Sequence, residues 1–94
     1  MGIEEEKRLN GTKTKYLEFR LIGGTEKTTL WNILGSNRTI ILGSIRWYSH
    51  WRQYCFFPEI ETIWNKDCLE SIYSFLGKLK QKRELLRNLT ENGN

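Results

Sequence analysis

Residues that build metal centres and catalytic sites are scarce in this chain of 94 residues. It has two cysteines, Cys55 and Cys68, one histidine, His50, and one aspartate, Asp67. The cysteines lack CxxC spacing, which excludes the common zinc and redox motifs. Cys55 and His50 form the one nucleophile-like pair, with no third group to orient the imidazole. We therefore expect no catalytic residue, metal or cofactor, and predict that the protein is not an enzyme.

Long apolar runs are also absent. No segment approaches the roughly 20 apolar residues that a membrane helix needs. The N-terminal sequence MGIEEEKRLNG lacks the apolar stretch of a secretory signal. We expect a cytoplasmic protein without a membrane partner, and in that reducing compartment both cysteines are expected to be free thiols.

The length allows one domain, because a second core would have too few residues left to bury. Hydrophobic residues make up 38% of the chain and aromatic residues 13%, so large rings must supply much of the core. The net charge of +4 favours phosphate-rich or anionic partners. Composition predicts a disordered tail over residues 1–12, a single domain over 13–89 and a frayed tail over 90–94.

Alternating polarity predicts four strands. In the first, Leu17, Phe19 and Leu21 fall on one side and charged residues on the other, as in a half-buried strand. Glycine, serine and asparagine mark the turns, and Pro58 ends the run because it cannot donate to a ladder. The expected strands cover residues 13–22, 28–34, 40–48 and 51–57, with Ser49 and His50 as a two-residue turn.

After Pro58 the hydrophobic period changes to about 3.6, which predicts one long amphipathic helix. Asn65 is the expected N-cap, and Gly77 suggests a close approach to the sheet or a bend. The expected apolar stripe contains Leu69, Ile72, Tyr73, Leu76, Leu79 and Leu86. The fold class is therefore α+β, an antiparallel sheet of three to four strands packed on one long C-terminal helix, in the order β-β-β-β-α. The basic residues late in this helix (Lys78, Lys80, Lys82, Arg83 and Arg87) match the helix dipole and are typical of a solvated face.

The segment GSIRWYSHWRQYCFFP carries the candidate site. A two-residue turn would turn Ile45, Trp47, Tyr54 and Phe56 toward the helix and leave polar and aromatic groups on the opposite face. The candidate ligand-binding residues are Arg46, Tyr48, His50, Trp51, Arg52, Gln53 and, from the second strand, Trp31. The equally open alternative is that the rings fill a small core and the arginines are solvated or stack on them.

Arginine forks match phosphate oxygens and aromatic rings stack on bases, so this face favours a phosphate-rich ligand. The ligand could be a nucleic acid or a signalling nucleotide. A small nucleotide would require a homodimer or higher oligomer to enclose it. The competing hypothesis is a protein–protein inhibitor in which Trp31, Tyr48 and Trp51 are aromatic anchors and Arg46 is a hot spot.

The residues LGSIRWYSHWRQYCFFP, followed by TIWNKDCLESIYSFLGKL, resemble a group of small bacteriophage and mobile-element proteins. The resemblance covers residues 27–80. It implies a phage accessory protein in the cytoplasm of a bacterial host, with anti-defence activity as the expected role and a host protein as one expected target, and it implies no chemistry. The order of three strands and a helix is also similar to AP2-type and integrase arm-binding domains, which makes Arg46, Arg52, Trp51 and Gln53 testable as readers of DNA.

Overall fold

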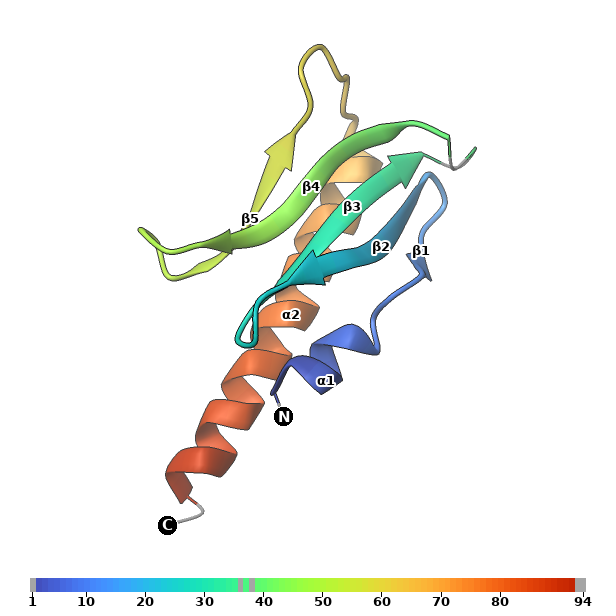
Figure 1. Cartoon of the computed structure of the whole chain (residues 1–94). Helices are drawn as coiled ribbons and strands as arrows, with labels where there is room; N and C mark the ends of the chain where they lie inside the picture. Colours follow the sequence, from blue (N-terminus) through green and yellow to red (C-terminus); the bar gives the residue numbers. More distant parts are fainter. Residues whose placement is uncertain (1, 36, 38, 93–94) are drawn as a thin grey trace.

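The computed structural model describes residues 2–35, 37 and 39–92, with side chains from Glu4 to Leu85 within those ranges. All strand pairs are antiparallel, and the strands follow one another across the sheet in the order β1-β2-β3-β4-β5 (Figure 1). The predicted α+β class is confirmed. The elements are α1 (Gly2–Lys7), β1 (Thr12–Lys13), β2 (Leu17–Gly24), β3 (Thr29–Gly35), β4 (Ile41–Tyr48), β5 (Gln53–Pro58) and α2 (Lys66–Asn92).

The predicted first strand is divided into β1 and β2 by a tight turn. Within this turn the Thr14 amide donates to the Leu17 carbonyl at 2.8 Å, and the Leu17 amide donates to Thr14 Oγ1 at 3.2 Å. β1 then pairs back onto β2, with Thr12 opposite Phe19. The turn allows five strands where the hydrophobic alternation predicted four.

The β4–β5 hairpin has a longer turn than predicted. Tyr48 lies opposite Gln53 and Trp47 opposite Tyr54, so four residues, 49–52, connect the strands. Arg52 closes the turn at φ 54°, and its amide donates to the Ser49 carbonyl at 3.2 Å. The register differs by two residues from the prediction. Because side chains alternate with a period of two, the predicted division of β4 and β5 between the faces is preserved.

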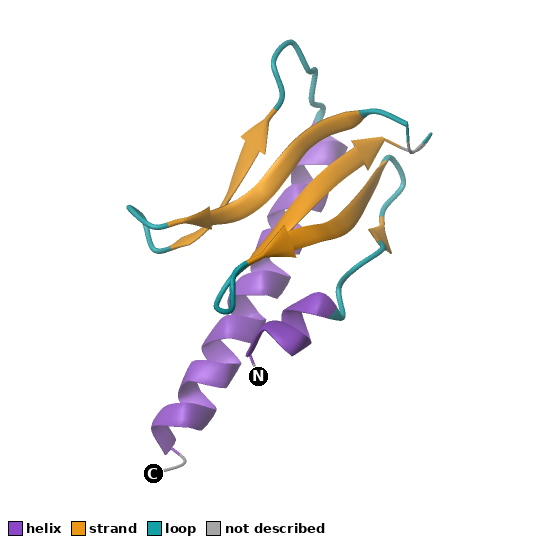
Figure 2. Cartoon of the chain, viewed as in Figure 1, coloured by secondary structure: helices purple, strands orange, loops and turns teal. Residues whose placement is uncertain are grey.

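The core lies between the sheet and α2, which covers one face of a single sheet layer (Figure 2). Phe75 of α2 stacks on Phe19 at 4.2 Å between centroids and meets the edge of Trp31 at 5.0 Å. The buried apolar residues of this core are Leu17, Phe19, Trp31, Ile33, Ile45, Tyr54, Ile72, Phe75 and Leu79.

The buried stripe of α2 differs from the predicted stripe. Phe75 is 1% exposed, whereas Tyr73 is 81% exposed and Leu69 is 48% exposed. A helix in a two-layer fold buries a narrow stripe, and here the stripe follows Ile72, Phe75 and Leu79. Tyr73 and Leu69 flank it. The predicted contribution of Leu86 lies outside the described side chains.

The helix α2 begins at the predicted cap and ends beyond the predicted boundary. Asn65 is the N-cap, as predicted, because its Oδ1 accepts the Cys68 amide at 2.8 Å. The helix continues to Asn92, beyond the predicted end at residue 89, and residues 93–94 lie outside the described chain. Its C-terminal part extends past the sheet, giving a molecule of 47 × 25 × 23 Å (Figure 1). None of the described helices combines the length and apolar composition needed to cross a bilayer.

The prediction of a disordered tail over residues 1–12 is wrong. Residues Gly2–Lys7 form α1, which packs beside α2, and Glu6 is 1% exposed. Glu5 Oε2 lies 3.6 Å from Lys82 Nζ on α2. Composition predicts disorder for residues 1–12 because they supply little apolar area to bury. α1 is instead held by charged side chains whose partners lie far away in the sequence.

Candidate functional site

Three of the predicted site residues lie on the sheet face opposite α2. Arg46 and Tyr48 of β4 share this face with Gln53 of β5, because Tyr48 and Gln53 are cross-strand partners. The Arg46 guanidinium lies over the Phe57 ring, 4.0 Å from its centroid. The sequence left open whether the arginines bind a ligand or stack on aromatic rings. Arg46 stacks on a ring, so its guanidinium is held against the sheet.

The β4–β5 turn holds an aromatic cluster. The Tyr48 ring contacts Trp51 edge to face at 5.1 Å and 88°, and it contacts His50 at 5.3 Å. Trp51 is nevertheless 66% exposed. The cluster fixes an indole in place while leaving most of its surface open to solvent, which is the arrangement that stacking on a ligand requires.

Trp31 is not part of the site, and its prediction as a ligand-binding residue is wrong. It is fully buried, and its Nε1 donates to Thr29 Oγ1 at 2.8 Å. The register of β3 with β4 places Trp31 opposite Ile45, on the face that α2 covers. Sequence alternation alone did not determine which face of β3 was inside.

A groove of about 650 Å³ lies between the β4–β5 hairpin and α2. The predicted residues Trp51 and Arg52 line its hairpin wall, and Gln53, although it shares a face with Tyr48, borders the groove from the edge strand β5. The opposite wall comes from α2 and was missed, because the sequence assigned Tyr73 to the core and the basic residues to a solvated face. The other lining residues are Trp47, Tyr54, Tyr73, Ser74, Leu76, Gly77, Lys80, Arg83 and Glu84.

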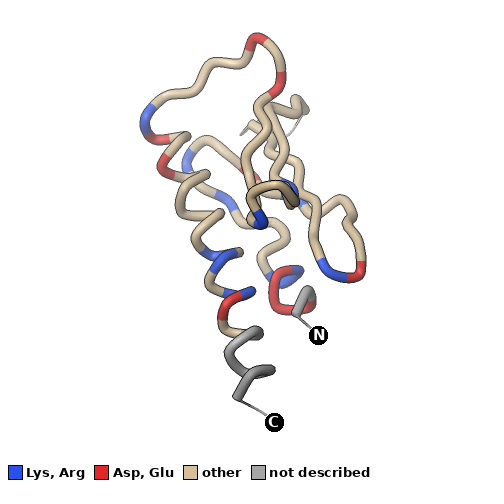
Figure 3. The backbone as a smooth tube through the Cα atoms, turned by 90° about the vertical axis from the view of Figure 1, so that its left-hand side faces the viewer, with Lys and Arg blue, Asp and Glu red and all other residues tan. Residues whose placement is uncertain are grey.

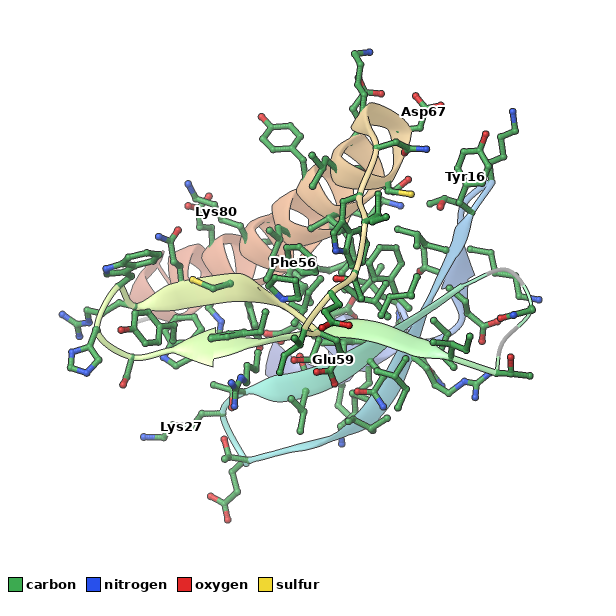
Figure 4. The ribbon with its side chains drawn as sticks, turned by 90° about the horizontal axis from the view of Figure 1, so that it is seen from above. Tyr16, Lys27, Phe56, Glu59, Asp67 and Lys80 are labelled. Atoms are coloured by element: carbon green, nitrogen blue, oxygen red, sulfur yellow. The ribbon has the colours of Figure 1, made fainter. Side chains whose placement is uncertain are left out.

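The groove is rich in positive charge. Arg52, Lys80 and Arg83 line it together with one carboxylate, Glu84. Figure 3 faces the β4–β5 turn and shows the basic positions of that turn beside those of α2. Figure 4 marks Asp67 at the beginning of α2 and Lys80 further along it. Lys80 Nζ lies 3.9 Å from Glu84 Oε1, an exposed pair worth only about 0.3–0.5 kcal/mol, so an anionic ligand could displace it.

A buried polar network adjoins the groove. The Glu6 carboxylate accepts hydrogen bonds from Thr29 Oγ1 at 2.9 Å, from the Tyr54 hydroxyl, and from Arg83 Nη2 at 3.1 Å. The Arg83 guanidinium also lies over the Trp47 ring at 4.5 Å. Burial, followed by the hydrogen bond to Glu6, raises the pKa of Tyr54 above its ordinary value. The network ties Tyr54 and Arg83, which both line the groove, to the buried Glu6 carboxylate.

The nucleophile-like pair is not activated in the structure. Burial raises the pKa of the Cys55 thiol, which disfavours the reactive thiolate. Cys55 Sγ donates to the Gln53 carbonyl at 3.8 Å, and the His50 ring contacts Tyr48. Among the described residues, no group of three or more His, Cys, Asp and Glu side chains could hold a metal ion.

Comparisons with known proteins find a phage relative. The chain is 28% identical over 72 residues, which are 76% of this chain and 92% of the relative, to an uncharacterised 9.3 kDa protein of Acholeplasma phage L2. No family model matches the chain. No solved structure matches it. The similarity is consistent with a phage origin and supplies no activity.

Proposed function

We propose that this chain is a non-enzymatic phage accessory protein that binds a phosphate-rich ligand, either nucleic acid or a nucleotide. One observation carries the proposal: a single groove combines exposed aromatic rings with three cations. Trp51 and Tyr73 are 66% and 81% exposed, and they stand on different walls. Rings that are left open to solvent contribute little to the core, so their position favours a role in binding.

The groove offers the two interactions that a nucleotide unit needs. A base stacked on an aromatic ring gains about 1–3 kcal/mol, and a phosphate gains charge-assisted hydrogen bonds from arginine or lysine. Arg52 presents a guanidinium at the turn, and Lys80 an ammonium from α2. The predicted reading residues on the opposite sheet face contribute less, because Arg46 is stacked on Phe57.

We also propose that the chain is not an enzyme. The raised pKa of Cys55 and the aromatic packing of His50 both argue against a nucleophilic mechanism. The phage relative supports the accessory role, and antagonism of a host defence in the bacterial cytoplasm is the role we propose for it.

A protein–protein inhibitor is the second candidate. Its specific support is the exposure of large rings on both walls of the groove, since Trp51 and Tyr73 resemble the aromatic anchors of an interface. In that case the groove would receive side chains of a host defence or regulatory protein.

Tryptophan fluorescence tests the proposal. Titration of the full chain with a short oligothymidylate and with nucleoside triphosphates is expected to change the emission of Trp51. Arg52→Ala and Lys80→Ala are expected to weaken binding, whereas Lys66→Ala at the start of α2 should not. For a single strand, log K should fall against log salt with a slope of about −0.7 per phosphate contact.

Absence of binding to every phosphate ligand at low salt would reject the proposal. A host protein retained by the chain from nuclease-treated lysate, and released by Trp51→Ala, would then favour the inhibitor. A nuclease-sensitive interaction would favour nucleic acid.

A further inference from the structure

The two ends of the groove differ in chemistry. Along α2, the wall begins with the uncharged residues Tyr73, Ser74 and Gly77 and continues to the charged residues Lys80 and Glu84. Tyr73 and Lys80 are separated by about 10 Å along the helix axis, because each helical residue rises about 1.5 Å. The α2 wall of the groove therefore has an aromatic end and a cationic end at a fixed separation, and Trp51 and Arg52 lie on the facing hairpin wall.

The middle of the groove is kept open by a glycine. A Cβ added at Gly77 would meet no atom within 4 Å among the described residues outside its own stretch of helix. The sequence suggested that Gly77 approaches the sheet closely, and the structure shows no such approach. What its missing side chain leaves is space between Tyr73 and Lys80 on the groove wall.

We infer that the groove takes a single nucleotide, with its base stacked on Tyr73 or Trp51 and its phosphates on Lys80 and Arg52. This inference rests on the proposed function and narrows it to a small ligand, held in the groove of one chain in place of the homodimer or higher oligomer expected from the sequence. A nucleotide has a flat aromatic group at one end and a polyanion at the other, which matches the two ends of the groove. The groove volume of about 650 Å³ falls within the range of small-molecule sites.

A polymer fits this site less well. Strands of nucleic acid bind along extended grooves with cations spaced to follow the backbone. Here Lys80 and Arg83 lie within one turn of α2 with Glu84 beside them, Arg52 faces them from the β4–β5 turn, and Arg83 is already held by Glu6. The arrangement suits one cluster of phosphates and offers no continuous path for a chain of them.

The test compares five probes by isothermal titration with the full chain: the four ribonucleoside triphosphates, each titrated separately, and tripolyphosphate. At least one triphosphate is expected to bind about tenfold or more tightly than tripolyphosphate, because only the nucleotide can stack a base. Equal affinity for tripolyphosphate would overturn the assignment of the aromatic end.

Gly77→Gln is the matched variant. Glutamine favours helix over glycine, so the variant should fold at least as well as the parent, while its side chain occupies the groove. We expect a loss of nucleotide affinity of about tenfold or more. Gln81→Ala, on the same helix but outside the groove lining, is the control and should bind normally. Unchanged affinity in Gly77→Gln would remove the site from this groove.

An oligothymidylate titration distinguishes failure of the proposed function from failure of the single-nucleotide site. If the oligonucleotide binds and no single nucleotide does, the further inference is wrong and the proposed function stands. If neither binds, both are wrong. Binding of the nucleotide with weaker binding of the oligonucleotide supports both.

Discussion

The interior beneath the sheet and the groove at the hairpin contain the same kinds of side chain in different settings. Trp31 is fully buried and its indole nitrogen is hydrogen-bonded, whereas Trp51 is 66% exposed. Arg83 is tied to Glu6 and stacked on Trp47, whereas Arg52 stands at a turn. Composition alone cannot separate structural from binding residues here. The register of each strand and the distant partner of each charge decide between the two.

The largest contrast is expected between the two tryptophans. Trp31→Ala should lower the free energy of unfolding by about 3–5 kcal/mol, because it empties a site in contact with Phe75. Trp51→Ala should change it by no more than about 0.5 kcal/mol and should weaken ligand binding instead. Urea denaturation followed by circular dichroism measures both. If Trp31→Ala does not fold, the milder Trp31→Phe replaces it. Equal losses in the two variants would contradict the contrast.

The buried network provides the next largest effect. Glu6→Gln removes the charge that faces Arg83 and should cost about 3 kcal/mol, at the lower end for a broken buried pair because Arg83 is 30% exposed. Glu4→Gln is the control, since Glu4 is exposed on the same helix and its ion pair among the described side chains is the exposed one with Lys7 at 3.8 Å. The measurement is again the denaturation midpoint. A similar cost for both variants would mean that α1 is not held by its buried carboxylate.

The pH dependence should follow Tyr54. Its pKa is raised above 10.0 in the folded protein, first by burial and then by Glu6, so the folded state holds the proton more tightly than the unfolded state. The contribution of protonated Tyr54 to the free energy of unfolding is complete below pH 10.0. It is lost as the pH rises through the pKa of Tyr54 in the folded state. Denaturation at a series of alkaline pH values should show a shallower decline in Tyr54→Phe. Parallel curves would show that Tyr54 is not the group responsible.

The smallest expected effect concerns the groove wall. Gly77→Ala should raise the free energy of unfolding by about 0.5–1 kcal/mol, because alanine favours helix and the added Cβ meets open space. By contrast, Gly43→Ala should destabilise, since its Cβ would lie 2.9 Å from the Phe57 carbonyl oxygen. Thermal unfolding compares the two. A destabilised Gly77→Ala would show that the helix needs glycine for a bend.

The sequence predicted the sheet and the long helix well for a physical reason. Alternation with a period of two divides a strand between faces regardless of the exact register, so a two-residue error at the β4–β5 turn left Trp47 and Tyr54 facing the helix. Asn65 was recognisable as an N-cap because capping is a local interaction.

The site was only half predictable. Trp51 and Arg52 were found because they belong to a segment that is too polar for a buried strand pair and too aromatic for an ordinary surface, whereas Tyr73 looked like part of an apolar stripe. The predicted stripe through Tyr73 and the buried stripe through Phe75 differ by a rotation about the helix axis. The contacts of Phe75 with Phe19 and Trp31 decide which stripe faces the sheet. Residues 1–12 were misjudged for a related reason, because the partners of Glu6 are distant in the sequence.

The most direct test of the account is a backbone and indole NMR titration of the whole chain with the tightest-binding nucleotide. The predicted result is a set of shifts at the Trp51 indole and at the amides of Arg52, Gly77 and Lys80, with little change at Arg46 and Phe57 on the opposite sheet face. Shifts confined to Arg46, Tyr48 and Phe57, with the groove unchanged, would contradict it.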